Sequence, residues 1–237
     1  MKIFNKLEYY LTNDSGNHRF LIEGYGIPGV GKSFLCNNFY KLYKEKFGGV
    51  YYHSIDDYPQ NRVVRILHKI LLILRGLLFT PSIIIANFKL INDFENIKGL
   101  VKLRLLFNLL LISSVIHRHW SRQNLLVLDQ GIFQAIWSCY FYNQCESSEV
   151  LSSRLVDLID ELLDKMCITK VVILNISSEK ATIVSRLTQR EIKGSSPMNS
   201  LEKSIIDRGS STTIHMGHFL IKAAEQSDRY KVFDIKN

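Results

Sequence analysis

Five short runs of Val, Ile, Leu and aromatic residues stand out along the chain, separated by longer segments with a helical spacing of apolar positions. The runs are residues 19–24, 50–55, 125–128, 171–176 and 230–235, and the helical patterns between them include 32–47, 150–166 and 179–190. Continuous apolar runs of this length are typical of parallel strands that are buried on both faces. The alternation therefore predicts an α/β fold with a doubly wound, five-stranded parallel sheet.

The segment between the second and third runs, residues 60–122, is the most apolar part of the chain. A first helix is predicted from Arg62 to Arg75, before a break at Thr80-Pro81, and a second from Ile97 to Arg118. Charges in the first helix recur every three, four and six residues. They form one narrow stripe on an otherwise apolar helix, and the stripe consists of Arg62, Arg65, Lys69 and Arg75.

The net charge of the chain is concentrated in this segment. The sequence has 237 residues with 30 Lys and Arg against 22 Asp and Glu, a formal net charge of +8, and 46% hydrophobic residues. From Arg62 to Arg122 there are ten basic residues and only two acids, so this stretch holds the entire excess. The composition excludes a disordered chain, and the local excess does not suggest a nucleic-acid-binding protein as a chain-wide excess would.

The amino-terminal residues and the cysteines indicate how the chain is divided into domains and where in the cell the protein is expected. Residues 1–18 end in a cluster of turn formers and are interpreted as an N-terminal extension, a short helix and linker, ahead of one domain over 19–237. The four cysteines are scattered, and the first residues lack the apolar core of a secretory signal. No uninterrupted apolar run reaches the ~20 residues of a membrane span. A cytoplasmic protein is expected.

A glycine-rich motif, Gly26-Ile-Pro-Gly-Val-Gly-Lys-Ser33, lies between the first predicted strand and the first long helix. It matches the pattern GxxxxGK[ST], in which glycines let backbone N–H groups turn inward around a phosphate. In that mechanism Lys32 reaches the β and γ oxygens of a nucleotide, and the Ser33 hydroxyl ligates Mg²⁺. ATP and Mg²⁺ are therefore the expected cofactors.

An acidic residue after the third run completes the predicted Mg²⁺ site. Asp129 follows Leu125-Leu-Val-Leu, and the carboxyl end of a strand beside the loop-bearing strand faces the phosphates. The next residue, Gln130, stands where many ATPases have the glutamate that polarises the attacking water, and no Asn-Lys-x-Asp base reader of GTPases is present. This combination favours transfer of phosphate to an acceptor.

Three segments together resemble the nucleoside and nucleotide kinase superfamily, most closely its thymidylate-kinase-like branch, over residues 20–237. They are Phe20–Gly24 with the following loop, Asp129–Trp137, and Val171–Arg190. In the middle segment, Gln130 stands where the family has an arginine. The resemblance implies a kinase-like strand order of 2-3-1-4-5. It also implies a nucleotide site formed by Gly26, Gly29, Val30, Gly31, Lys32, Ser33 and Phe34.

The same resemblance implies catalytic residues besides Lys32. Arg186 and Arg190 match the arginines of a lid, expected over 186–205, that neutralises the transferring phosphoryl group. At the end of the second strand, Asp56 or Asp57 is expected to accept the proton of the acceptor hydroxyl, with His53 close by. A plain turn is the alternative interpretation of these two aspartates.

The basic apolar segment, 62–122, allows more than one function. In the resembling family this region binds the acceptor, which favours a small, anionic acceptor here. The alternative is a peripheral membrane or protein partner that docks on the stripe and the apolar face. Nucleic acid is disfavoured because no aromatic residues interleave the stripe. A second function therefore stays open, a P-loop ATPase or nucleotide-binding switch with a membrane-associated partner, for example in surface-polysaccharide synthesis.

Overall fold

The structure is built on a parallel β-sheet. The computed structural model describes residues 2–13, 18–47, 49–54, 58–97, 99–120, 124–143, 149–191 and 203–236. Within these residues the sheet has five strands in the order β2-β3-β1-β4-β5, and all neighbouring pairs are parallel. In chain order the strands are β1 (Phe20–Tyr25), β2 (Val50–His53), β3 (Leu125–Leu128), β4 (Lys170–Ser177) and β5 (Tyr230–Lys236). The predicted α/β class and strand order are confirmed.

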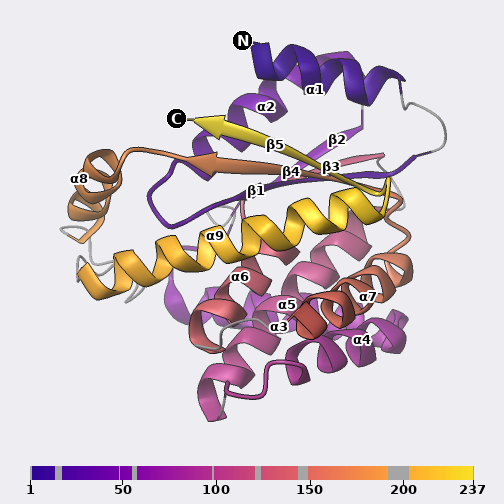
Figure 1. The fold of residues 1–237 in the computed structure, drawn as a ribbon. Helices are drawn as coiled ribbons and strands as arrows, with labels where there is room; N and C mark the ends of the chain where they lie inside the picture. The colour runs from indigo at the N-terminus through magenta and orange to yellow at the C-terminus, as the bar shows by residue number, and fades with distance from the viewer. Residues whose placement is uncertain are drawn as a thin grey trace.

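Helices cover both faces of the sheet (Figure 1). On one face lie α1 (Lys2–Asn13) and α2 (Lys32–Phe47), and α8 (Lys180–Glu191) adds Ile183 and Leu187 to the same core. The other face is covered by α6 (Ile132–Asn143), α7 (Glu149–Lys165), α9 (Lys203–Gln226) and two helices of the 60–122 segment. The strands β1, β3 and β4 are buried on both sides, which explains their continuous apolar runs.

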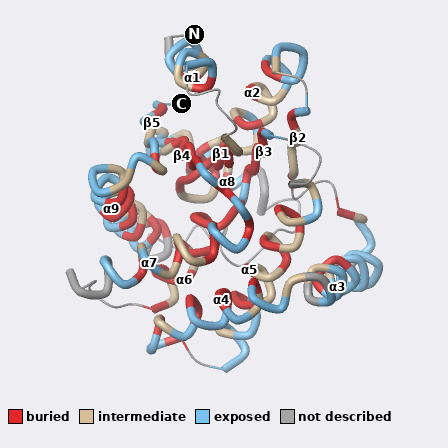
Figure 2. Tube along the Cα trace, turned by 90° about the vertical axis from the view of Figure 1, so that its right-hand side faces the viewer, coloured by how far each residue is buried: buried red, intermediate tan, exposed pale blue. Residues whose placement is uncertain are grey.

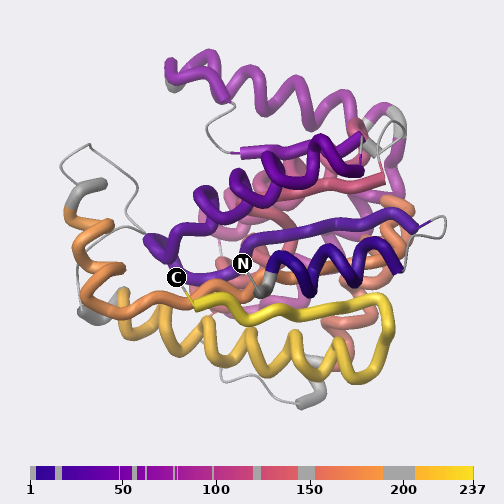
Figure 3. Tube along the Cα trace, turned by 90° about the horizontal axis from the view of Figure 1, so that it is seen from above, coloured from indigo at the N-terminus to yellow at the C-terminus, as the bar shows by residue number. Residues whose placement is uncertain are grey.

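The N-terminal helix α1 shares its core with the rest of the chain. Leu7 and Leu11 are buried, and the Tyr43 hydroxyl of α2 donates a hydrogen bond to the Phe4 carbonyl at 2.7 Å. The segment predicted as an extension thus contains a helix that packs on the sheet beside α2, as the view from above also shows (Figure 3).

The segment between β2 and β3 forms three helices, α3 (Arg62–Phe79), α4 (Pro81–Asn92) and α5 (Gly99–Trp120). Asn61 caps α3, because its side-chain oxygen accepts hydrogen bonds from the backbone N–H groups of Val63 and Val64. α3 and α5 approach closely, since a Cβ added at Gly76 would lie 2.3 Å from the Ser114 hydroxyl. α3 lies on the outside of the molecule, with exposed residues along most of its length (Figure 2).

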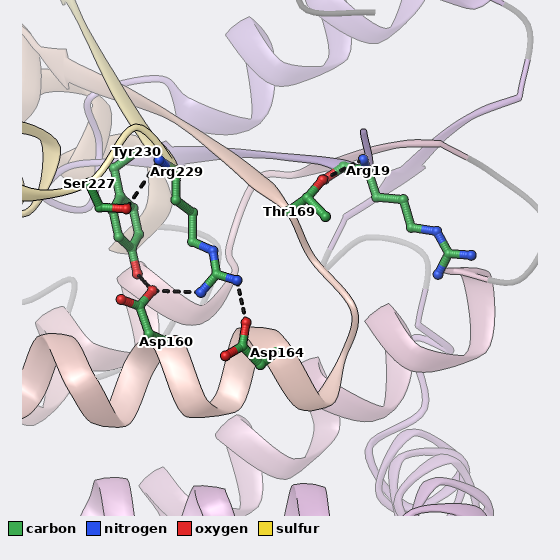
Figure 4. A network of polar contacts seen from close by, with 7 residues as sticks. All are labelled: Arg19, Asp160, Asp164, Thr169, Ser227, Arg229 and Tyr230. Atoms are coloured by element: carbon green, nitrogen blue, oxygen red, sulfur yellow. Dashed lines mark hydrogen bonds and ion pairs between the residues drawn. The ribbon is translucent and has the colours of Figure 1, made fainter. Parts of the chain in front are cut away.

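A polar network fastens α7 to the amino-terminal end of the sheet (Figure 4). The Arg229 guanidinium, just before β5, donates to Asp160 at 2.8 Å and also to Asp164, and the Tyr230 hydroxyl donates to Asp160. The Arg19 N–H, just before β1, donates to the Thr169 hydroxyl at 2.8 Å. These hydrogen bonds and ion pairs attach the amino-terminal end of the sheet to α7 and to the segment before β4.

Among the helices that the structure describes, α4, α6 and α9 have no counterpart in the predicted elements. α4 and α6 are apolar over most of their surfaces, so they lack the one-sided pattern of a surface helix. α9 contains Gly209, Gly217 and the run Ser210–Thr213, all poor helix formers. Buried residues at helical spacing, among them Met216 and Phe219, favour the helix over this local preference.

Candidate functional site

The glycine motif forms a loop between β1 and α2 with a backbone that requires glycine. Gly26, Gly29 and Gly31 have φ angles of +146°, +92° and +99°, a region that L side chains rarely adopt. A Cβ at Gly26 would also lie 2.5 Å from the Ile176 carbonyl oxygen of β4. Of the other residues in the predicted nucleotide site, Val30 is buried in the core and Phe34 is 65% exposed on the first turn of α2.

Two cationic side chains predicted to act on the phosphates meet at this loop. The Lys32 ammonium is buried and donates hydrogen bonds to the carbonyls of Gly26 at 2.7 Å and Ile27 at 3.1 Å. The Arg186 guanidinium of α8 donates to the carbonyls of Gly29 at 3.2 Å and Val30 at 3.0 Å. Residues far apart in the sequence are thus joined at one loop, where Arg186 contacts backbone carbonyls.

Asp129 lies directly after β3 and is buried. Its carboxylate accepts a hydrogen bond from the Ser54 hydroxyl at 2.9 Å, and its N–H donates to the His53 carbonyl at 3.4 Å. The Cys36 thiol, one turn after Lys32 on α2, donates to the Leu128 carbonyl at 3.6 Å, directly before Asp129. Burial raises the pKa of Cys36, and Asp129 adds to the rise. Asp129 therefore directly follows a residue that contacts the helix of Lys32.

A second buried carboxylate, Glu23 of β1, holds the start of α6. Its oxygens accept hydrogen bonds from the backbone N–H groups of Gly131 and Phe133 at 3.1 Å and of Gln134 at 2.6 Å. Burial raises the pKa of Glu23 to about 7, against the lowering effect of these N–H groups. Gly131 is required because a Cβ there would lie 2.3 Å from a Glu23 oxygen. Glu23 thus fixes the chain that follows Asp129.

A cavity of about 110 Å³ opens beside Asp129, between the ends of β2 and β3 and the helices α3, α5 and α6. It is lined by His53, Tyr58, Lys69, Asn108, Leu111, Ile112, Asp129, Gln130, Gly131, Gln134, Ala135 and Ser138. Among the described residues, the buried Gln134 Oε1 accepts no hydrogen bond. His53 Nε2 and the Tyr58 hydroxyl are 3.0 Å apart. The cavity therefore combines hydrogen-bonding groups with apolar walls, as small-molecule sites do.

The cavity also contains a cation from the basic stripe. The Lys69 ammonium lies 4.7 Å from the centre of the Tyr58 ring. Burial lowers the pKa of Lys69, and the nearby positive charges of Arg65 and Arg104 lower it further. An anion bound here would lower the free energy of this group of cations.

The residues present fit Mg²⁺. Ser33, at the first turn of α2, and Asp129 offer only oxygen atoms, and Mg²⁺ commonly takes one or two protein ligands with phosphate and water supplying the rest. Within the described ranges, no group of three or more His, Cys, Asp or Glu side chains is arranged to hold a metal ion. His119, in the His-x-His pair at the end of α5, instead stacks on Tyr51 with the ring centres 3.6 Å apart.

Several predicted residues lie outside the described residues. Asp56 and Asp57 are among them, as are 192–202 of the expected lid. Arg190 belongs to α8, but its side chain is not described. Ser54 and Tyr58, which flank 55–57, both belong to the site, through Asp129 and through the cavity.

Sequence reasoning assigned no role to several residues of the site. Ser54 and Tyr58 lie in no recognised motif, and Glu23 and Gln134 belong to resembling segments but had no stated role. The start of α9 was also missed, where Gly209 lies against Ile27 of the loop. Apart from the isolated acid within an apolar strand at Glu23, no pattern in the sequence marks these contacts.

Comparison with known proteins does not identify the chain, since no protein-family model and no curated protein matches its sequence.

Proposed function

We propose that this protein is a P-loop phosphotransferase that moves the γ-phosphoryl group of ATP, with Mg²⁺, to a small anionic acceptor. The observation that carries the proposal is the position of Asp129. It directly follows Leu128, which contacts α2 one turn after Lys32, and at the same time lines a cavity that holds Lys69. A phosphate-binding site and a small-molecule cavity that share one carboxylate are the arrangement that phosphoryl transfer requires.

Each side chain at the loop has a task in this proposal. The loop N–H groups and Lys32 hold the β- and γ-phosphates, and Lys32 exchanges its two loop carbonyl partners for phosphate oxygens. Arg186 turns from the Gly29 and Val30 carbonyls to the transferring group and neutralises its charge. Ser33 and Asp129 would hold Mg²⁺, which when bound neutralises charge on the phosphate oxygens.

The cavity holds the acceptor in this proposal. Lys69 offers a positive charge and Gln134 a buried hydrogen-bond acceptor, which together suit a compact molecule with one anionic group and at least one hydroxyl. The hydroxyl gives its proton to a carboxylate on attack. Asp56 and Asp57 remain the predicted bases.

The test is a transfer assay with γ-labelled ATP, MgCl₂ and separate panels of nucleosides, nucleoside monophosphates and sugar phosphates. We expect labelled product with one class of acceptor. Release of inorganic phosphate alone, whatever the acceptor, would overturn the proposal and favour the ATPase or nucleotide-binding switch.

Two sets of variants separate the roles of the residues. Lys69→Gln is expected to raise KM for the acceptor at least tenfold and to leave KM for ATP unchanged. Arg118→Gln removes the same charge from an exposed position on α5 and serves as its control. Asp56→Asn and Asp57→Asn are tested singly, and wild-type turnover in both would exclude either as the base.

A further inference from the structure

The outer face of α3 exposes a continuous apolar stripe. Its side chains are between 39% and 78% exposed, and the stripe consists of Val63, Leu67, Ile70, Leu71, Leu74 and Leu78. Apart from the adjacent pair Ile70 and Leu71, successive positions are three or four residues apart, so they lie on one side of the helix. α3 runs along the outside of the molecule, where no other described element covers this side (Figures 2 and 3).

The arrangement of α3 is the reverse of an ordinary surface helix. The side that faces α5 contains Lys69, Leu72, Ile73 and Gly76, and it carries the cation that lines the cavity. Among the α3 side chains that the structure describes, the exposed ones are mostly apolar, with Arg65, His68 and Arg75 as the polar exceptions. A helix normally turns its apolar stripe to the core and its charges to water. The exposed stripe is therefore suited to a surface outside this chain.

The charges around the stripe determine what kind of surface it fits. α3, α4 and α5 contain no Asp or Glu, while α3 alone has four basic residues and α5 has three. Arg75 flanks the stripe, three residues from Leu78 and four from Leu71, and long basic side chains reach from an apolar layer to charged groups above it. A second copy of this chain would bring equal charges face to face, which opposes self-association through this surface.

We infer that α3 docks this protein on an anionic phospholipid surface, with the apolar stripe among the acyl chains and the exposed basic residues, Arg75 at the flank of the stripe among them, at the headgroups. An amphipathic helix with basic flanks and large aliphatic residues is the form that lies in a membrane interface. At 18 residues α3 is about 27 Å long, enough to lie in the plane of the interface. The inference is independent of the proposed phosphoryl transfer.

Helices α3 to α5 could instead cross the bilayer, but the packing of α5 inside the protein opposes this arrangement. Among the described helices, Gly99–His119 of α5 is long and apolar enough to span by length and composition, despite Lys102 and Arg104 near its start. A bent pair, Val63–Gly76 with Pro81–Asn92, meets the same criterion. However, 44% of the α5 segment is buried inside the protein, and its Asn108 lines the cavity. Removing α5 would dismantle the core beneath the sheet.

The test measures binding of the full chain to vesicles by flotation. Vesicles of equal parts phosphatidylglycerol and phosphatidylcholine are compared with phosphatidylcholine alone at low and high NaCl. We expect binding to the anionic vesicles that falls at least tenfold in high salt, as headgroup charge requires. No binding to anionic vesicles, or equal binding to both kinds, overturns the inference.

Variants locate the surface. Leu67→Ser, Leu71→Ser and Leu74→Ser combined are expected to reduce the bound fraction at least tenfold. All three side chains are exposed, so the variant is expected to keep the fold, which circular dichroism checks. The matched control is Leu42→Ser, Ile214→Ser and Ile221→Ser, three exposed residues on α2 and α9. Equal binding of the two triple variants contradicts a docking role for α3.

Further measurements distinguish a lipid surface from the two alternatives, a second copy of this chain on the stripe and helices that span the bilayer. Leu71→Trp is expected to shift its fluorescence to the blue on anionic vesicles, whereas Leu42→Trp is not. A dimer that the α3 triple variant abolishes, without vesicle binding, assigns the stripe to a second copy and overturns the inference. Binding that survives carbonate extraction assigns the helices to a spanning arrangement and overturns it as well.

Discussion

Arg186 is the residue whose position is most informative about the loop. Its guanidinium contacts two loop carbonyls from a helix more than 150 residues further along the chain. If the proposed phosphoryl transfer occurs, a cation held this close to the loop would need little reorganisation to reach the transferring group.

Arg186→Ala is therefore expected to reduce kcat for phosphoryl transfer by ~10²–10³-fold, with a smaller effect on the Kd for ATP, because the charge matters most in the transition state. Steady-state kinetics and nucleotide titration measure the two quantities. Lys180→Ala is the control, since Lys180 lies on the same helix and pairs with Asp207 on the surface. Equal loss in both variants would contradict a specific role for Arg186.

Glu23 makes stability depend on pH. Its pKa is raised to about 7 in the folded chain from 4.5, so the folded state binds the proton more tightly than the unfolded state. The contribution of Glu23 to the free energy of unfolding is therefore greatest below pH 4.5 and falls as the pH rises through about 7.

Glu23→Gln removes this titration. We expect the free energy of unfolding of the wild type to fall relative to the variant between pH 5 and pH 8, by about 1–3 kcal/mol. Urea unfolding at a series of pH values measures the difference. Parallel pH profiles for the two proteins would show that the carboxyl does not titrate in this range.

At the scale of elements, the N-cap of α3 gives a direct test of what holds that helix. Asn61 satisfies two backbone N–H groups at the start of an otherwise exposed helix. Asn61→Ala is expected to lower stability by about 1 kcal/mol and to speed amide hydrogen exchange in the first turn of α3. Asn61→Ser keeps a capping oxygen and should behave as the wild type. Unchanged exchange in Asn61→Ala would mean that contacts with α5 alone hold this turn.

The elements also show how far the sequence predicts this structure. Strands buried on both faces leave a continuous apolar run, so β1, β3 and β4 could be predicted, whereas the order of the sheet was predicted from the family resemblance alone. α9 could not, because its glycines and hydroxyl residues disfavour a helix locally and only packing of residues such as Met216 stabilises it.

In the site, the loop could be predicted because its spacing is fixed by backbone geometry. The cavity could not, because Tyr58, Lys69 and Gln134 meet only in the folded chain.

At the scale of the whole molecule, the two ends of the sheet differ, because the candidate site lies at the carboxyl ends of the strands and a polar network lies at the amino-terminal end. The carboxyl ends of β1 and β3 lead into the glycine loop and Asp129, while the amino-terminal end is held by Arg229, Tyr230 and Asp160 (Figure 4). Asp160→Ala leaves the partly buried Arg229 and the Tyr230 hydroxyl without this acceptor, so we expect a loss of about 1–3 kcal/mol in stability.

The same variant should keep the wild-type Kd for ATP, because the change lies at the opposite end of the strands from the loop. Thermal unfolding and nucleotide titration check the two expectations together. Weaker ATP binding at a temperature where the variant is fully folded would show that the two ends are coupled.

The place of β1 in the sheet also determines the order in which the chain can fold during synthesis. β1 is made first, yet its neighbours follow about 100 residues later for β3 and about 150 residues later for β4. At ~5–20 residues per second, the ribosome leaves β1 unpaired for roughly 5–20 s. Helices α3 to α5 are complete before β3 is made. The apolar stripe of α3 is thus exposed to the cell before any sheet exists, and the early risk for the nascent chain is aggregation through this helix.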